Sequence, residues 1–171
     1  MGVIAGVVAS PTFIEEFNDP DPTHVGLVVA LFTVGCVVGA AFAGPLGDYT
    51  GRRATLTAGS LVFLVGGCIQ TAAQTIDYLY AGRFLAGVGT GILVMIVPLY
   101  QAELAHPSIR GRINALVQFM LGIGSFLAAW ITYGTLLHET TNAQWRIPLG
   151  IQNAPTVFLA SLIWFFPESP R

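Results

Sequence analysis

Three charged residues stand in a short turn between two uncharged stretches, and they are the first candidates for chemistry. Asp48, Arg52 and Arg53 separate residues 24–47 from residues 54–76, and neither stretch contains Asp, Glu, Lys or Arg. Charged side chains are costly to place in hydrocarbon, so these three are expected to hold the turn in water or among lipid headgroups. A plain loop between two membrane spans would also carry such residues, and that alternative stays open from these residues alone.

Arg83 is the next candidate, because it lies five residues into the apolar stretch 78–102. It could be an interfacial arginine whose guanidinium reaches the outer headgroups. It could equally be a buried cation, which would need a carboxylate or a polar cavity. The residues themselves leave both alternatives open.

Gln118 is a carboxamide in the middle of an apolar stretch, residues 113–137. Its side chain offers two donors and an acceptor, and burying it without partners would be costly. It could bond to a neighbouring helix or to a polar ligand. Other amides are expected to hold helices together: Asn114, Gln152 and Asn153. Gln70 and Gln74 lie near a helix end and are expected to meet water.

Glycine and proline mark the places where helices turn, approach or bend. Gly51 allows a tight turn, since it can adopt backbone angles that a side chain forbids. Four glycines between positions 82 and 91 weaken a helix there. Close packing of another helix along the Gly87–Gly91 face would compensate, and Pro98 is expected to kink this helix.

The composition shows which elements position these residues. Of 171 residues, 54% are hydrophobic and 9% are charged, whereas about a quarter are charged in soluble domains. The net charge of −2, with no basic patch, excludes a nucleic-acid partner. Cys36 and Cys68 lie in apolar stretches and are expected to be small buried hydrophobic residues, not a disulfide or a metal pair.

The uncharged stretches predict an all-α membrane protein, a single six-helix transmembrane bundle over residues 1–171. About 20 apolar residues cross the hydrocarbon layer, and the spans are expected at about 1–13, 24–46, 54–76, 78–102, 113–137 and 146–166. The first is short, so Met1 is expected to begin partway through a helix and the chain to be a fragment. With the Arg52–Arg53 turn in the cytoplasm, five of the seven arginines lie on that side, as the positive-inside rule requires.

The ordered motifs resemble a known family. The spacing Gly44-x-x-x-Asp48-x-x-Gly51-Arg52-Arg53 resembles the major facilitator signature between spans two and three, although Tyr49 stands where that family usually has a basic residue. Three further motifs resemble the sugar porter branch, in particular fungal hexose and polyol carriers: Gly82-Arg83-Phe84-x-x-Gly87-x-Gly89-x-Gly91 with Pro98-x-Tyr100-x-x-Glu103, then Arg110-Gly111, then Pro167-Glu168-Ser169-Pro170-Arg171. The chain corresponds to the amino-terminal half of that twelve-span fold.

The resemblance implies transport of a monosaccharide or polyol by alternating access, and no enzyme activity, cofactor or metal. The implied partners are the sugar or polyol, the lipid bilayer, the carboxy-terminal six-helix half and, in the full-length carrier, protons. The implied location is the plasma membrane, and this half is expected to be inactive alone. The alternative is a transporter-like sugar sensor or a non-transporting assembly partner.

The resemblance also assigns roles to residues. Asp48, Arg52, Arg53, Glu103 and Arg110 would form a cytoplasmic gate cluster, which Glu168 would join. Gln118, followed six residues later by Gly124, would contact the sugar. Arg83 would pair with an aspartate whose position precedes Met1, so proton symport through that pair is not open to the chain as given.

Overall fold

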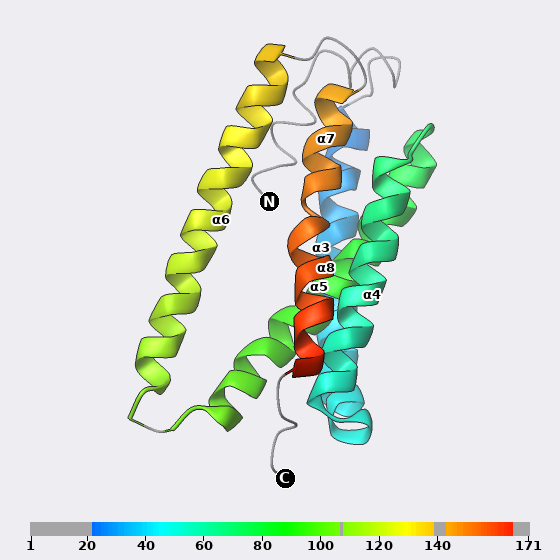
Figure 1. Cartoon of the computed structure of the whole chain (residues 1–171). Helices are drawn as coiled ribbons and strands as arrows, with labels where there is room; N and C mark the ends of the chain where they lie inside the picture. Colours follow the sequence, from blue (N-terminus) through cyan, green and yellow to red (C-terminus); the bar gives the residue numbers. More distant parts are fainter. Residues whose placement is uncertain (1–21, 107, 139–142, 166–171) are drawn as a thin grey trace.

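The computed structural model describes residues 22–106, 108–138 and 143–165, which form helices joined by short turns (Figure 1). The elements are α3 (Pro22–Thr50), α4 (Arg52–Thr71), α5 (Ile76–Leu104), α6 (Arg110–His138), α7 (Ala143–Ile151), α8 (Ala154–Leu162) and the short 3-10 helix η1 (Ile163–Phe165). Within the described residues, five segments are long and apolar enough to cross a membrane, the fifth being α7, α8 and η1 together. The expected first span, residues 1–13, lies outside them.

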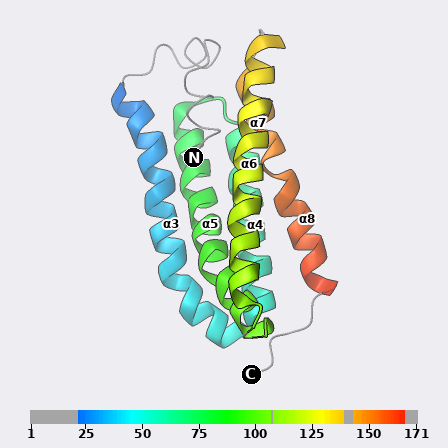
Figure 2. The same ribbon diagram turned by 90° about the vertical axis from the view of Figure 1, so that its left-hand side faces the viewer.

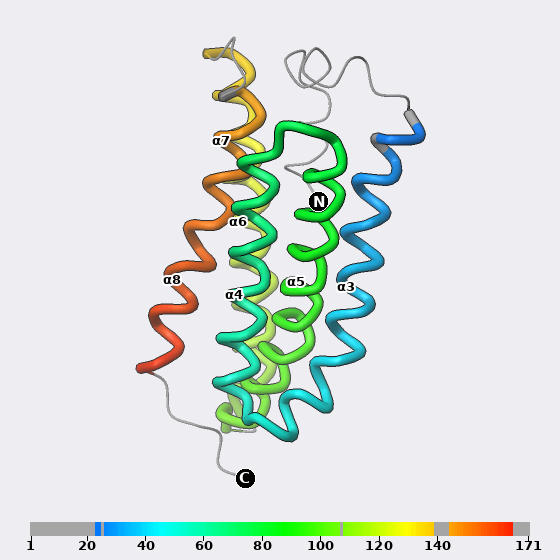
Figure 3. The backbone as a smooth tube through the Cα atoms, turned by 90° about the vertical axis from the view of Figure 1, so that its right-hand side faces the viewer, coloured from blue at the N-terminus to red at the C-terminus, as the bar shows by residue number. Residues whose placement is uncertain are grey.

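Helix α5 is the centre of the bundle, with α3 on one side and α4 on the other (Figure 3). Figure 2 shows α3, α5 and α4 running alongside one another, while α7 and α8 follow the outside of α4. Helix α6 has far fewer contacts with the rest and stands apart in Figure 1. It meets α7 near the end that carries His138 and α5 only near the end that carries Arg110.

Small residues explain why α5 can touch two helices so closely. A Cβ atom added at Gly87 would meet the backbone of Phe32 and Gly35 in α3, and one at Gly91 would meet the backbone carbonyl of Cys36. On its other side, a Cβ at Gly89 would lie 2.5 Å from the backbone nitrogen of Phe63 in α4. The two glycine faces of α5 therefore let backbones of both neighbours approach to van der Waals contact.

The turn between α3 and α4 is shorter than the sequence predicts. The expected helix end at about residue 46 was wrong, because α3 continues through Pro45 to Thr50. Gly51 is the one residue between the two helices. Its φ of 90° is a value that other residues rarely adopt. A proline inside a helix removes one hydrogen bond and need not end it. Asp48 consequently lies on the last turn of a helix, one turn before Arg52.

The last span is not one helix. The sequence predicts an unbroken segment over 146–166, but the chain leaves the helix at Gln152 and Asn153, between α7 and α8. Pro155 has no N–H group to bond the carbonyl of Ile151, and its ring clashes with that carbonyl in a regular helix. The backbone instead makes a tight turn, in which the Asn153 N–H donates to the Gly150 carbonyl at 3.0 Å.

Two further expectations need correction. Gln70 is fully buried instead of meeting water, and its Nε2 donates to the carbonyl of Gly82 at 3.1 Å. The absent side chain of Gly82 leaves room for the Gln70 backbone and the Cγ of its side chain, a tertiary effect that position along the chain does not reveal. Cys68 is exposed and Cys36 half-buried, and both are free thiols. A small apolar side chain in a membrane span can face lipid, so these two cysteines need not be covered by another helix. Gln74 is exposed, as expected.

Candidate functional site

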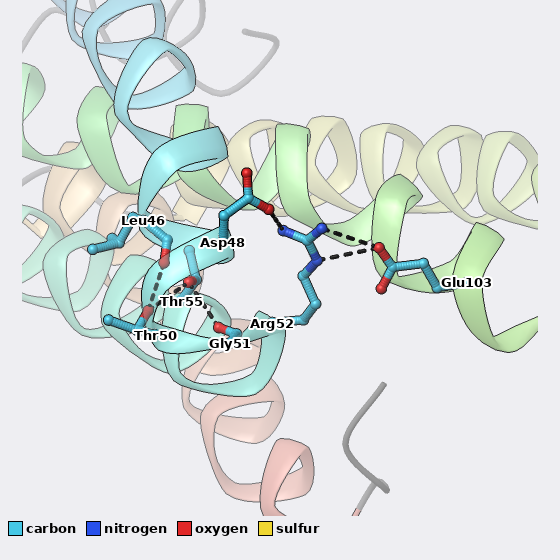
Figure 4. A network of polar contacts seen from close by, with 7 residues as sticks. All are labelled: Leu46, Asp48, Thr50, Gly51, Arg52, Thr55 and Glu103. Carbon is cyan, nitrogen blue, oxygen red and sulfur yellow. Dashed lines mark hydrogen bonds and ion pairs between the residues drawn. The ribbon is translucent and has the colours of Figure 1, made fainter. Parts of the chain in front are cut away.

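One guanidinium joins the ends of three helices (Figure 4). Arg52, in the first turn of α4, lies with Nη1 3.1 Å from Asp48 Oδ1 at the end of α3. Its Nη2 lies 3.1 Å, and its Nε 3.2 Å, from Glu103 Oε1 at the end of α5. The Arg52 side chain is 13% exposed, that of Glu103 30% and that of Asp48 71%. The Arg52–Glu103 pair is therefore the more sheltered one, and the Asp48 pair is largely in solvent.

The turn around Gly51 holds Arg52 in this position. The Thr55 hydroxyl donates to the Gly51 carbonyl at 2.9 Å, and the Thr50 hydroxyl donates to the Leu46 carbonyl at 2.7 Å. A Cβ at Gly47 would lie 2.7 Å from Arg52 Nη1, so glycine leaves the space that the guanidinium fills. A Cβ at Gly44 would meet no described atom within 4 Å.

Arg53 and Arg110, which the resemblance places in the same cluster, contact other groups. Arg53 Nη2 donates to the backbone carbonyl of Trp164 at 2.8 Å, and its Cζ lies 5.3 Å from the centre of the Trp164 ring. Arg110 Nε donates to the carbonyl of Ala105 at 3.2 Å. Across the described ranges, the ion pairs are those of Arg52 alone. Glu168 lies outside these ranges.

The contact between Arg53 and Trp164 is one that the sequence analysis missed. It links the first turn of α4 to η1, at the same end of the bundle as Arg52. A cation close to the face of an indole is attracted by the ring quadrupole. The sequence offers one signal for this contact. Trp164 lies near the end of the last apolar stretch, and Arg53 is expected on the same side of the membrane.

Arg83 is buried in α5, with 3% of its surface exposed. Its Nε has no hydrogen-bond partner among the described residues. The sequence left two alternatives open for Arg83. Its burial matches the buried cation and not an arginine that extends to the headgroups. A buried arginine is costly unless it faces a polar cavity or an anion.

Gln118 lies on an exposed face of α6, at a hollow of about 430 Å³ between α5 and α6. The hollow is lined by Pro98, Gln101, Asn114, Ala115, Val117 and Gln118. Asn114 was expected to join helices but lines this hollow with Gln118, and their four-residue spacing was the signal. Gln101 was not singled out, since nothing in its immediate sequence separates it from any other amide near a helix end.

The remaining amides have separate surroundings. Gln152 lines a second, apolar hollow of about 580 Å³ between α6 and the α7–α8 break. Asn153 lies against Gly67 of α4, and its Oδ1 has no hydrogen-bond partner in the described part of the chain. Neither residue lines the hollow that contains Gln118. Among these amides, the ones that line one hollow together are therefore Gln101, Asn114 and Gln118.

Comparison with known proteins agrees with this architecture. A family model described as "Sugar (and other) transporter" matches residues 1–171. The low-affinity glucose transporter HXT4 of Saccharomyces cerevisiae is 35% identical over 179 residues, covering 99% of this chain and 31% of the yeast protein. The quinate permease of Neurospora africana is also 35% identical over 179 residues, covering 98% of this chain and 33% of the permease. The chain thus spans about a third of the length of these curated relatives.

A solved structure shows the same fold. The inward-open xylose transporter XylE from E. coli superimposes with a TM-score of 0.84 at 25% identity, over 99% of this chain and 44% of that one. The family match covers the whole sequence, and the matched part of the relatives is their amino-terminal portion. The chain is therefore a member of the sugar transporter family of the major facilitator superfamily.

Proposed function

We propose that this chain is the amino-terminal half of a carrier that moves a monosaccharide or polyol across the plasma membrane by alternating access. Its family is one of transporters and not of enzymes. The observation that carries the proposal is the Arg52 cluster, which joins α3, α4 and α5 at one end of the bundle through a single side chain. A lock of this kind can hold the helix ends together in one state and release them in the other.

The cluster has the properties of a gate and not of a permanent structural tie. Asp48 is largely in solvent, and exposed ion pairs contribute about 0–1 kcal/mol each. Such contacts can exchange with water at little cost. With the arginine-bearing end in the cytoplasm, the cluster would be closed when the carrier faces outward and open when it faces inward.

Gln118 is the proposed sugar contact in this half. Its amide can donate to one hydroxyl and accept from another. It lies on an exposed face of α6, where the second six-helix half would complete the site. Helix α6 is the least covered of the five apolar segments, with 6% of its most apolar window buried. Lipid and the carboxy-terminal half are the proposed partners of that surface.

Arg83 is the proposed coupling residue of a proton-linked carrier. A protonatable carboxylate facing this guanidinium would change its ion pairing on each transport cycle. The ion pairs within the described residues all involve Arg52, so they provide no such partner for Arg83. A carrier of this sequence couples to protons only if a carboxylate reaches Arg83 from outside these residues.

A chimeric carrier tests the proposal. This chain replaces the matched amino-terminal portion of HXT4, and the chimera is produced in yeast that lacks its own hexose carriers. We expect saturable uptake of labelled glucose by the chimera and no uptake by the chain alone. A fluorescent protein fused to the carboxy terminus reports arrival at the plasma membrane.

Each outcome has a meaning. Saturable uptake by the chain alone would overturn the half-carrier assignment. A chimera that reaches the plasma membrane and binds sugar without transporting it would favour the sensor alternative. A chimera that reaches the membrane and neither binds nor transports any of glucose, xylose and sorbitol would overturn sugar transport.

A further inference from the structure

The hollow between α5 and α6 contains more polar groups than the proposed sugar contact alone. Besides Gln118, its lining includes the carboxamides of Gln101, from α5, and Asn114, from α6. The other lining residues, Pro98, Ala115 and Val117, are apolar. No charged side chain is among them.

Helix geometry brings the three amides to one place. Asn114 and Gln118 are four residues apart, so they share a face of α6 and are separated by about 6 Å along its axis. Gln101 follows Pro98 by three residues, in the part of α5 that bends toward the start of α6 (Figure 1). A proline inside a helix produces such a bend. The two helices therefore present donors and acceptors to the same hollow.

These amides are available to a ligand. Within the described part of the chain, no side-chain hydrogen bond of Gln101, Asn114 or Gln118 is found. Amides that join helices are expected to be paired with each other or with backbone, as Gln70 is with the Gly82 carbonyl. Arg110 lies one turn before Asn114 on α6, but its guanidinium bonds to the Ala105 carbonyl and is not part of the lining.

We propose that Gln101 and Asn114 extend the Gln118 contact into a subsite for an uncharged, polyhydroxylated molecule. The proposal rests on the proposed function, whose neutral sugar or polyol it keeps as the ligand, and adds two specificity-determining residues. An amide can donate to and accept from hydroxyl groups at once. A carboxylate substrate would favour a cation, usually an arginine, in the lining. The chain's relatives include both a glucose transporter and a quinate permease, so the charge of the substrate separates real alternatives.

The subsite lies between Gln118 and the helix ends that the Arg52 cluster joins, because Gln101 precedes Glu103 by two residues. A substrate that leaves Gln118 toward this end would meet Asn114 and Gln101 next.

Binding to the whole 171-residue chain in lipid nanodiscs tests the subsite. Ligand-observed saturation-transfer NMR detects weak binding, and the probes are D-glucose, sorbitol and quinate. We expect glucose or sorbitol to bind and quinate to bind at least tenfold more weakly. Gln101→Ala and Asn114→Ala should each weaken binding of the neutral probe about fivefold, the loss of roughly one hydrogen bond.

Gln74→Ala is the matched control, because it removes an exposed amide outside the hollow and should leave binding unchanged. Helical circular dichroism and thermal unfolding confirm that each variant folds. Sugar binding that survives both Gln101→Ala and Asn114→Ala would overturn the subsite while leaving the carrier proposal intact. Equal or tighter binding of quinate would also overturn it. Failure of the unaltered chain to bind either neutral probe would overturn the subsite, whereas the carrier proposal would still be judged by uptake through the chimera.

Discussion

Arg52 lies in the first turn of α4 and Glu103 in the last turn of α5, so each charge opposes the dipole of its own helix. A negative charge at the start of a helix or a positive charge at its end is stabilising by about 0.3–1 kcal/mol. Arg52 and Glu103 are each placed the opposite way, so both lack this stabilisation. The ion pair offsets this loss only while the two helix ends are together. Its main effect is therefore on the difference between closed and open arrangements, and less on the total free energy of unfolding.

A double-mutant cycle should rank the two ion pairs of Arg52. The sheltered pair with Glu103 should give a coupling energy of about 1 kcal/mol, since charge-assisted hydrogen bonds exceed exposed pairs. The pair with Asp48, which is 71% exposed, should give less than about 0.5 kcal/mol. The measurement is unfolding in mixed micelles for the single and double alanine variants at positions 48, 52 and 103. Equal coupling in both cycles, or a larger value for Asp48, would contradict the geometry.

The identity of charged residues at helix ends could be predicted from the sequence, but their partners could not. Asp48 and Arg52 were expected at one turn because both flank Gly51 in the chain. Arg53 contacts Trp164, and Arg110 donates to the Ala105 carbonyl. Which partner each arginine meets depends on how the helices pack, and the sequence does not give this. Gln70 shows the same limit, since only the absence of a side chain at Gly82 creates the space that it occupies.

At the scale of elements, α5 depends on its glycines for contact with both neighbours. The spans themselves could be predicted because freedom from charge over about 20 residues is a local property. The break between α7 and α8 could not be predicted. A proline in a span can kink the helix, end it or leave it intact, according to the hydrogen-bond partners that neighbouring helices supply. The length of α3 was underestimated for the same reason, since Pro45 was tolerated.

Gly39→Ala should separate α3 from α5. A Cβ at this position would meet the carbonyl group and Cα of Val88, which are backbone atoms that cannot move without moving the helix. Overpacking of this kind costs about 1–3 kcal/mol. Gly26→Ala in the same helix is the control, because its Cβ would meet nothing within 4 Å, and it should be neutral or stabilising by up to about 1 kcal/mol. Thermal unfolding in detergent compares the two, and a Gly39→Ala variant as stable as Gly26→Ala would show that α3 and α5 are not held at this distance.

At the scale of the whole molecule, charge distinguishes the two ends of the bundle. The Arg52 cluster, the Arg53–Trp164 contact and Arg110 all lie at the end where α3 and α5 finish and α4 and α6 begin. At the opposite end, His24 Nδ1 lies 2.6 Å from the Tyr80 hydroxyl, and Asp77 occupies the first turn of α5. Arginine near the ends of spans orients a bundle with that side in the cytoplasm. The proposal that the Arg52 cluster is the cytoplasmic gate needs this orientation, because that gate must open toward the cell interior.

Labelling from one side of the membrane tests that orientation. Cys36 and Cys68 are first replaced by alanine, so that a thiol-reactive maleimide that cannot cross membranes reports one introduced cysteine at a time. Tyr49→Cys tests the arginine-bearing end, where Tyr49 is 90% exposed beside the Arg52 cluster. Gln74→Cys tests the exposed turn between α4 and α5 at the opposite end. In sealed cells, the Gln74→Cys variant should react and the Tyr49→Cys variant should react only after permeabilisation. Tyr49 lies at the end of the bundle that carries Arg52, Arg53, Arg110 and Arg112, and the positive-inside rule places that end in the cytoplasm. The reverse pattern would invert the bundle and make the Arg52 cluster an outer gate, and reaction of both variants in sealed cells would mean that the chain does not hold a single orientation in the membrane.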